Sequence, residues 1–301
     1  IHGEVERLTV LHSKLGERIL EGDRIVYLGN FIGYGKSIIR TIDELLLFRR
    51  QIMAAPPMNT CDIVFLRGQQ EEMWQKTLQL HLSVGPSEVL VWMLEQGLRA
   101  TLAAYGGDEE TALRRARSGA LELARWTNEL RRHMQNHEGH IELMASLRRA
   151  ALTEEETLLF VNSGIDPDRP LDAQGDAFWW NFKGFTSVSE QFAGFKKVVR
   201  GFDPAGRGVD VDSWTATIDS GCGRGGPLTA MCFNKSGDEV EYSIRFARRS
   251  GKLEMLRGQN HKKKKKVSLK KLERTQRIRS EGLERVAYDP KSVEKFGGIV
   301  E

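Results

Sequence analysis

The sequence is poor in cysteine and lacks any long apolar run, and each absence excludes a class of protein. Its three cysteines (Cys61, Cys222 and Cys232) are too few and too scattered for a disulfide framework or a zinc ribbon. We therefore expect buried thiols in a reducing compartment, the cytoplasm. No stretch approaches the roughly 20 consecutive apolar residues of a membrane-spanning helix, so we expect no transmembrane segment.

The composition is that of a folded domain. Of the 301 residues, 40% are apolar and 29% charged, which is too apolar for a disordered chain. The sequence begins with Ile1 rather than with methionine, so we expect a processed, trimmed or fragmentary start, with which a targeting segment can be lost.

Helix and strand signals alternate over the first 70 residues. Apolar residues recur at helical spacing over 4–20 and 37–53, which predicts two amphipathic helices. Short apolar runs that end at glycines predict buried strands at 23–29 and 61–68. A helix between two buried strands is typical of α/β layering with a largely parallel sheet.

Residues 70–150 are predicted to be almost wholly helical, and residues 82–150 to form an insertion that caps the α/β core or binds a partner. Strand signals then return between glycine turns and indicate a second sheet; they lie at 157–162, 197–201, 214–219, 228–233 and 240–246. We therefore predict an α/β fold, a two-sheet sandwich flanked by helices, in a domain of residues 1–256 followed by a basic tail at 257–301.

Five turns follow strands or stand where a strand would end. In open α/β sheets, ligands bind at the carboxyl ends of the strands, so the turns form a candidate polar site, although each is also compatible with an ordinary loop. They are Ile1-His2-Gly3, 29–35 (Gly-Asn-Phe-Ile-Gly-Tyr-Gly), 67–71 (Arg-Gly-Gln-Gln-Glu), 161–164 (Val-Asn-Ser-Gly) and 199–203 (Val-Arg-Gly-Phe-Asp).

The order and spacing of these turns resemble the calcineurin-like metallophosphoesterases, in the branch of the serine/threonine protein phosphatases and bacterial diadenosine tetraphosphatases. That family carries Gly-Asp-x-His-Gly, Gly-Asp-x-x-Asp-Arg-Gly, Gly-Asn-His-Glu, a His-Ala-Gly turn and a Gly-His turn, in this order. The resemblance spans about residues 1–245 and implies the family's fold. It also implies two divalent metals (Mn, Fe or Zn) that activate a bridging hydroxide and polarise phosphoryl oxygens.

Most residues that would bind these metals differ here. His2 alone keeps its residue type, and the first aspartate of the series would lie before Ile1. The substitutions are Asn30 for the bridging aspartate, Gln69 and Gln70 for the asparagine and histidine of the third motif, and Asn162 and Phe202 for the histidines of the fourth and fifth.

These substitutions predict a phosphatase-like fold without phosphatase chemistry. Two divalent cations bring four positive charges, whereas amide carbonyls are neutral, weak ligands. We therefore expect no cofactor, and a binding, regulatory or assembly role with a protein or ribonucleoprotein partner. The alternative is an active phosphoesterase, a protein serine/threonine phosphatase or dinucleotide polyphosphate hydrolase. It would need two divalent metals, or one held by His2 with Asn30, Gln70 and Asn162.

Three further features have both a functional and a structural interpretation. His133, His137 and His140 have the spacing of ligands on one helix face, but their polar neighbours and Gly139 predict a solvated helix end. The glycine-rich turn at 221–226 is either an anion-binding backbone nest or a plain turn between strands. The tryptophan pair at 179–180 is predicted to lie in a loop, where it either belongs to the hydrophobic core or lines a substrate groove.

The two ends of the chain differ in charge. From Arg257 onward there are 14 Lys or Arg and 6 Asp or Glu, whereas residues 1–256 have 31 and 35, so the body is mildly acidic and the tail strongly basic. Such a run is either a solvated tail or a binding site for nucleic acid or an anionic membrane. The residues that we expect to bind a polyanion are Lys262, Lys263, Lys264, Lys265, Lys266, Lys270 and Lys271.

We expect the tail from Arg257 to bind polyanions and the body alone not to bind them. The five consecutive lysines repel one another, and binding to phosphates releases counterions, so affinity should fall steeply with salt. For each tenfold rise in salt, each phosphate contact should lower the affinity by about 0.9 log units on duplex DNA and by about 0.7 on single strands. Labelled RNA and anionic vesicles, titrated against the full chain and a 1–256 truncation, test this. Equal binding by both proteins, or binding independent of salt, would leave the tail a solvated segment.

Overall fold

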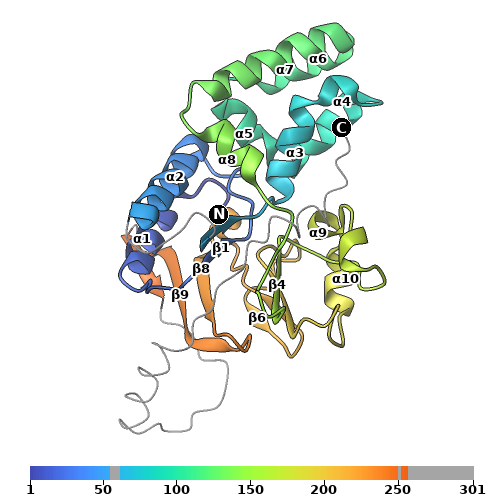
Figure 1. Ribbon diagram of the computed structural model, residues 1–301. Helices are drawn as coiled ribbons and strands as arrows, with labels where there is room; N and C mark the ends of the chain where they lie inside the picture. Colours follow the sequence, from blue (N-terminus) through green and yellow to red (C-terminus); the bar gives the residue numbers. More distant parts are fainter. Residues whose placement is uncertain (55–61, 250–251, 257–301) are drawn as a thin grey trace, which may run out of the picture.

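The computed structural model describes residues 1–54, 62–249 and 252–256 (Figure 1). Its amino-terminal part alternates helix and strand as the sequence predicts: α1 (Val5–Gly16), β1 (Ile25–Tyr27), α2 (Ile38–Ala54) and β2 (Ile63–Phe65). The two strands pair in parallel, with Tyr27 opposite Phe65. This confirms the predicted α/β layering of the first 70 residues.

Helices fill the segment from 69 to 146, which lies at the top of the view in Figure 1. They are α3 (Gln69–Leu78), α4 (Pro86–Met93), α5 (Arg99–Ala104), α6 (Glu109–Arg117), α7 (Ala120–Gln135) and α8 (His140–Ser146). A wide π-helical turn, Leu94–Leu98, joins α4 to α5 at Gly97, whose φ is 105°. Between α6 and α7 the helical segment is interrupted at Gly119, whose φ of 98° does not fit a helix.

A five-stranded mixed sheet follows, in the order β3-β4-β5-β7-β6. Its central strands, β4 (Leu158–Val161), β5 (Lys197–Arg200) and β7 (Thr215–Thr217), are parallel and match predicted strands. The antiparallel edges β3 (Ala151–Leu152) and β6 (Asp210–Val211) have two residues each, too few for a visible pattern.

An antiparallel sheet completes the described chain, in the order β10-β9-β8. Its strands are β8 (Leu228–Phe233), β9 (Glu239–Arg249) and β10 (Lys252–Leu256), and α1 lies against β8 and β9. The fold is thus mixed α/β with a mixed sheet. The two-sheet sandwich stays a prediction, because the described strands form three separate sheets. None of the described helices is long and apolar enough to cross a membrane.

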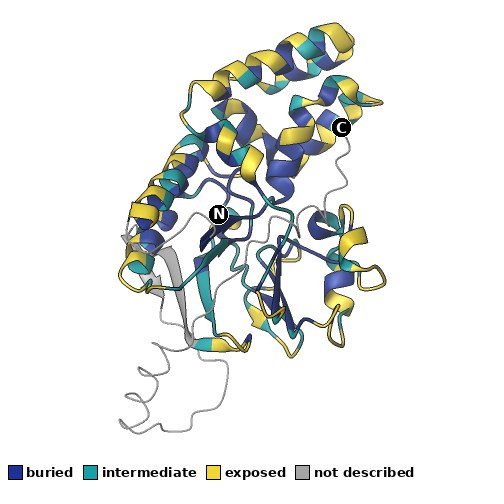
Figure 2. Cartoon of the chain, viewed as in Figure 1, coloured by how far each residue is buried: buried dark blue, intermediate teal, exposed yellow. Residues whose placement is uncertain are grey.

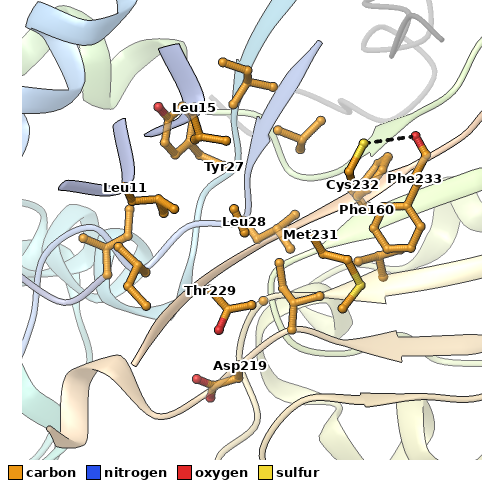
Figure 3. Close-up of a pocket in the computed structure, with 18 of the residues that line it drawn as sticks. Leu11, Leu15, Tyr27, Leu28, Phe160, Asp219, Thr229, Met231, Cys232 and Phe233 are labelled. Carbon is orange, nitrogen blue, oxygen red and sulfur yellow. Dashed lines mark hydrogen bonds between the residues drawn. The ribbon is translucent and has the colours of Figure 1, made fainter. Parts of the chain in front are cut away.

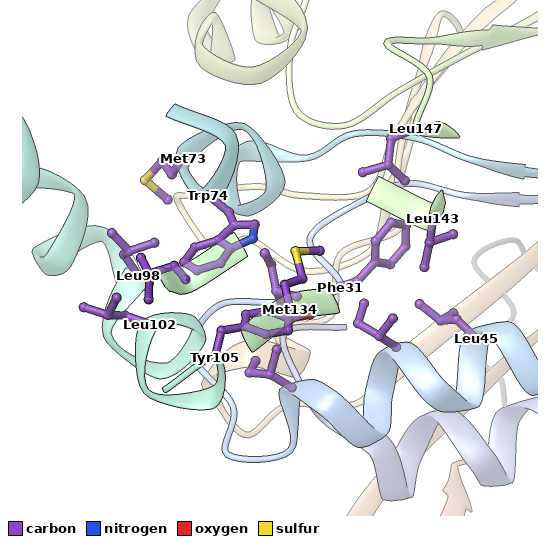
Figure 4. Close-up of a cluster of buried hydrophobic side chains, with 14 of the residues drawn as sticks. Phe31, Leu45, Met73, Trp74, Leu98, Leu102, Tyr105, Met134, Leu143 and Leu147 are labelled. Carbon is purple, nitrogen blue, oxygen red and sulfur yellow. The ribbon is translucent and has the colours of Figure 1, made fainter. Parts of the chain in front are cut away.

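The largest hydrophobic cluster is continuous across the helices. Leu8 of α1 and Ile42 of α2 belong to the same cluster as Trp74, Trp126 and Leu130 of the helical segment. Figure 4 shows its centre, and in Figure 2 the exposed residues lie on the outer faces of the helices. A second cluster packs Leu28 and Val64, beside β1 and in β2, against Phe160 and Val199 of the five-stranded sheet. The helices and sheets therefore support one another through shared cores.

The aromatic pair at 179–180 lies in helices rather than in the predicted loop. α9 (Ala177–Trp180) and α10 (Phe182–Ser187) follow β4, and the Asn181 side chain caps α10 by accepting from Gly184 N. Trp179 is 3% exposed and belongs to the interior, whereas Trp180 packs beside Trp92 with ring centroids 5.5 Å apart.

Two buried histidines each join a tyrosine to an acid of α2. His12 Nδ1 lies 2.6 Å from Glu44, and its Nε2 lies 2.9 Å from the Tyr27 hydroxyl. His140 Nε2 lies 3.0 Å from Asp43, and its Nδ1 lies 2.8 Å from the Tyr105 hydroxyl. The predicted helix end is present here, since α7 stops at Gln135, but His140 itself is fully buried rather than solvated.

We expect stability to fall as the pH drops below about 6.5, the pKa of an exposed histidine. Burial lowers the pKa of His12 and of His140. The unfolded chain therefore binds protons that the folded chain excludes, and the stability present above pH 6.5 is lost as the pH falls.

Urea unfolding between pH 8 and pH 5.5 measures this slope. His12→Gln should flatten it, and the exposed control His133→Gln should leave it unchanged. A slope identical in both variants and the natural chain would contradict the assignment to His12.

Candidate functional site

The turns after β1, β2, β4 and β5 meet at the carboxyl ends of these strands, beside the chain's first residues. Backbone hydrogen bonds join His2 N to Asn30 O (2.7 Å) and Phe202 N to Asn162 O (2.9 Å). Side-chain oxygens of the two asparagines accept from the backbone N–H groups of the two glutamines. The structure thus brings together His2, Asn30, Gln69, Gln70, Asn162 and Phe202.

Glu71 is the carboxylate that organises the first half of this site. It lies in the first turn of α3, is 2% exposed, and accepts hydrogen bonds from four backbone N–H groups. Three donors belong to the turn after β1 (Asn30 at 2.8 Å, Phe31 at 2.7 Å and Ile32 at 3.2 Å), and the fourth is Gly68 at 2.8 Å. Burial raises the pKa of Glu71, while these donors favour the charged form and oppose the rise.

Asn30 occupies a left-handed backbone position, with a φ of 55°, which asparagine tolerates better than most residues. Its Oδ1 accepts from Gln70 N at 3.1 Å. The Gln70 side chain turns away and donates to Gln96 O at 2.8 Å, in the wide turn before α5. Asn30 and Gln70 therefore tie the turn after β1 to α3, and α3 to the helical segment.

Asn162 uses both ends of its amide. Its Nδ2 donates to Leu28 O at 2.6 Å, and its Oδ1 accepts from Gln69 N at 3.3 Å. Its backbone oxygen accepts from Gly201 and Phe202. An amide can donate and accept at once, whereas a carboxylate only accepts. Asn162 thus links the ends of three strand connections in a way that an aspartate would not.

Gln69 anchors α9 to the site. Its Nε2 donates to Trp179 O at 2.6 Å, and the Trp179 indole N–H donates to Arg67 O at 2.8 Å. The guanidinium of Arg149 lies 5.3 Å from the Trp179 ring centroid. These contacts hold the Trp179 ring in the wall of the site, where its role is structural.

His2 lies between two aromatic rings. The Tyr34 ring centroid is 5.4 Å from it and that of Phe202 is 5.7 Å. Burial lowers the pKa of His2 well below its usual range, and the nearby chain amino group and Arg224 act in the same direction. The ring is therefore neutral at physiological pH. Its Nδ1 is buried without a hydrogen-bond partner.

A buried ion pair, which no pattern in the sequence predicts, flanks the site. Arg200 and Asp203 are 2% and 1% exposed and lie 3.3 Å apart, and Arg207 bonds the same carboxylate at 2.7 Å. Burial alone would raise the pKa of Asp203, but the bond to Arg207 and the charge of Arg200 hold it below its usual range. Both residues belong to the turn at 199–203, which is the only signal the sequence offers for them.

The donor set at the site does not fit two divalent metals. The amide oxygens of Asn30 and Asn162 already accept backbone N–H groups, and the Glu71 carboxylate accepts four. Phe202 adds an aromatic ring and no donor. Within the described residues, no group of three or more His, Cys, Asp or Glu side chains is placed to hold a metal ion.

The remaining candidates from the sequence, the glycine-rich turn at 221–226 and the lysines of the tail, do not belong to this site. The turn at 221–226 closes on itself, since Arg224 N and Gly226 N donate to Gly221 O, and Arg7 donates to the oxygens of Cys222 and Gly225. Burial raises the pKa of the Cys222 thiol, which disfavours a nucleophilic thiolate. The lysines from Lys262 to Lys271 lie outside the described residues.

We expect Glu71→Gln to lower the free energy of unfolding by about 3 kcal/mol, because an amide nitrogen would face backbone donors that now bond to a carboxylate oxygen. Urea unfolding at pH 7.5 measures the loss. Glu129→Gln, on the exposed face of α7, is the matched control and should change stability by less than about 0.5 kcal/mol. Equal stability of the two variants would show that Glu71 does not hold the turns together.

No protein-family model and no curated protein matches the sequence. Among solved structures, the chain is similar to a candidate diadenosine tetraphosphatase, with 14% identity, 86% of this chain and 91% of that chain covered, and a TM-score of 0.41. It is also similar to a protein serine/threonine phosphatase from Saccharomyces cerevisiae, with 13% identity, coverage of 87% and 79%, and a TM-score of 0.37.

Proposed function

We propose that this chain is a metallophosphoesterase-like protein that does not hydrolyse phosphate esters and serves as a binding or assembly module. The observation that carries the proposal is the engagement of the polar side chains at the strand ends. Asn30, Gln69, Gln70 and Asn162 each bond to backbone groups of neighbouring turns. They stabilise the turns and leave the site without anionic ligands.

Charge supports this proposal. A dinuclear site needs carboxylates to offset the metal charges. The two carboxylates of the clustered turns are already engaged, Glu71 by four backbone donors and Asp203 by the guanidinium groups of Arg200 and Arg207. His2 is neutral and packed between rings, so it would be a single imidazole ligand among amides. An active phosphoesterase with an altered site remains the alternative, and the experiment below separates the two.

An exposed apolar segment supports a protein partner. Between α3 and α5, Leu82 is 75% exposed, Val84 97% and Trp92 45%. Together with the partly exposed Trp180, Trp92 borders a pocket of about 430 Å³ between α3, α4 and α9. Apolar side chains gathered on one surface are typical of binding sites. We propose that a protein or ribonucleoprotein partner binds the helical segment, with the basic tail contacting nucleic acid or an anionic membrane.

We expect the purified chain to carry substoichiometric Mn, Fe and Zn, and to show no turnover of an aryl phosphate. Elemental analysis and a colorimetric assay with added metals measure both. A chelator should leave the melting temperature unchanged, because no metal contributes to the native state. Stoichiometric metal, together with turnover that His2→Ala abolishes, would establish the alternative.

Replacing Asn30 by aspartate tests the same proposal by introducing a carboxylate where the site now has an amide. The new carboxylate would be buried without a cation, so the melting temperature should fall, and added Mn²⁺ should not restore it. Asn136→Asp, at the exposed end of α7, is the control for the charge change alone. Recovery of stability with Mn²⁺ would show that the site can accept a metal.

A further inference from the structure

Two cavities that the described residues form differ in their relation to the candidate site. A cavity of about 240 Å³ lies between β1 and β8 (Figure 3). His2 and Asn30 line it, so it adjoins the candidate site. The pocket of about 430 Å³ between α3, α4 and α9 is lined by none of the six residues that the site brings together. This pocket is therefore a separate place for a binding partner.

The lining of the pocket between α3, α4 and α9 passes from buried to exposed apolar side chains. Met73, Leu80 and Met93 are buried and line it. The exposed Leu82 and Trp92 line it as well. Exposed leucine and tryptophan side chains beside a buried apolar lining are typical of a place where a second protein inserts an apolar side chain.

The exposed side chains of the pocket stand on hydrogen-bonded backbone. Leu82 N donates to Gln79 O at 2.9 Å, within the 3₁₀ turn Leu80–Leu82. Gly85 then has a φ of 67° and is followed by Pro86, the first residue of α4. Since the turn and the helix hold their backbone without a partner, binding there loses little conformational entropy.

Each tryptophan of the pocket follows an acid by one helical turn. Glu88 precedes Trp92 by four residues in α4. Asp176 precedes Trp180 by four residues, and Trp180 N donates to Asp176 O at 3.1 Å. Residues four apart on a helix are neighbours, so each carboxylate lies on the side of the helix that carries the ring. Both acids are exposed, and neither pairs with a cation of the described chain.

The charges around the pocket are mainly negative. Residues 79–98 contain two acids and no lysine or arginine, and residues 165–183 contain four acids and two basic residues. Lys76, the one lysine or arginine among the lining residues, lies 3.6 Å from Glu72. The surroundings therefore attract positive charge, and the exposed indole rings offer faces to which lysine and arginine bind.

We propose that this pocket binds a basic amphipathic segment of a partner protein. An apolar side chain of that segment enters the pocket beside Trp92. Lysine or arginine side chains on either side of it pack on the two tryptophan rings and pair with Glu88 and Asp176. The proposal rests on the proposed binding role of the helical segment, and it names the chemistry of the partner.

The probe is a labelled peptide of leucine and lysine about 18 residues long, enough for about five helical turns. Its affinity for the full chain is measured by fluorescence anisotropy. A second peptide has glutamine in place of lysine, and a third has serine in place of leucine. The leucine–lysine peptide should bind at least about tenfold more tightly than either, because the apolar and the charged contacts both contribute to its affinity.

Variants of the full chain locate the binding. Leu82→Ser combined with Trp92→Ala should weaken it at least about tenfold, because both changes remove apolar contacts at the centre of the site. Leu121→Ser, at an exposed position of α7, is the control and should leave the affinity unchanged. Glu88→Gln combined with Asp176→Asn changes two exposed side chains. This pair should weaken binding about fivefold at low salt, and less at high salt.

Three results would overturn the proposal. The first is equal binding, or no binding, by the natural chain and both double variants. The second is equal affinity of the lysine and glutamine peptides, which would show that the pocket has no preference for positive charge. The third is binding that appears only after the five lysines at 262–266 are replaced by glutamine, which would make the chain's own tail the occupant. Metal content and turnover are measured separately, so each result leaves the proposed lack of phosphoesterase activity standing.

Discussion

The arrangement of the candidate site depends on the four hydrogen bonds that Glu71 accepts. They join the turn after β1 to the start of α3, two segments about 40 residues apart in the sequence. A carboxylate has lone pairs for four donors and no hydrogen to conflict with them, so it suits a place where several backbone N–H groups converge. The positions of Asn30 and Gln70 follow from this contact, because both lie next to the residues that Glu71 binds.

Around Glu71, the amides connect turns to turns. A side chain that both donates and accepts hydrogen bonds can link a backbone carbonyl to a backbone N–H group. Asn162 does so between Leu28 O and Gln69 N. A cluster of such links is self-sufficient, since each buried polar group finds its partner within the protein. Among the six residues that the site brings together, His2 Nδ1 and Asn30 Nδ2 are the exceptions, and both residues also line the cavity between β1 and β8.

Much of the fold could be predicted from the sequence, because long periodic segments such as α2 and short apolar runs such as β4 carry their own signals. The strands β3 and β6 could not, since two residues show no period. His140 was expected in solvent because its sequence neighbours are polar. Its burial comes from Tyr105 and Asp43, which the chain brings from distant elements.

The candidate site was predictable as a set of strand ends, because residue types in turns are visible in a sequence. What each side chain does there was not. Glu71 resembles any acid in the first turn of a helix, and nothing local indicates that its partners lie after β1. The ion pair of Arg200 with Asp203 is hidden for the same reason, since i,i+3 spacing outside a helix predicts no contact. The roles of the six site residues therefore stay predictions.

The hydrogen bonds of His12 and His140 to α2 restrict how this helix can move as a rigid body. Asp43 and Glu44 are consecutive, and successive side chains of a helix project about 100° apart. One therefore bonds to His140, from the helical segment, and the other to His12, from α1. A rotation of α2 about its axis that shortened one contact would lengthen the other. The two hydrogen bonds therefore fix the rotation of α2 about its own axis as well as its position between α1 and the helical segment.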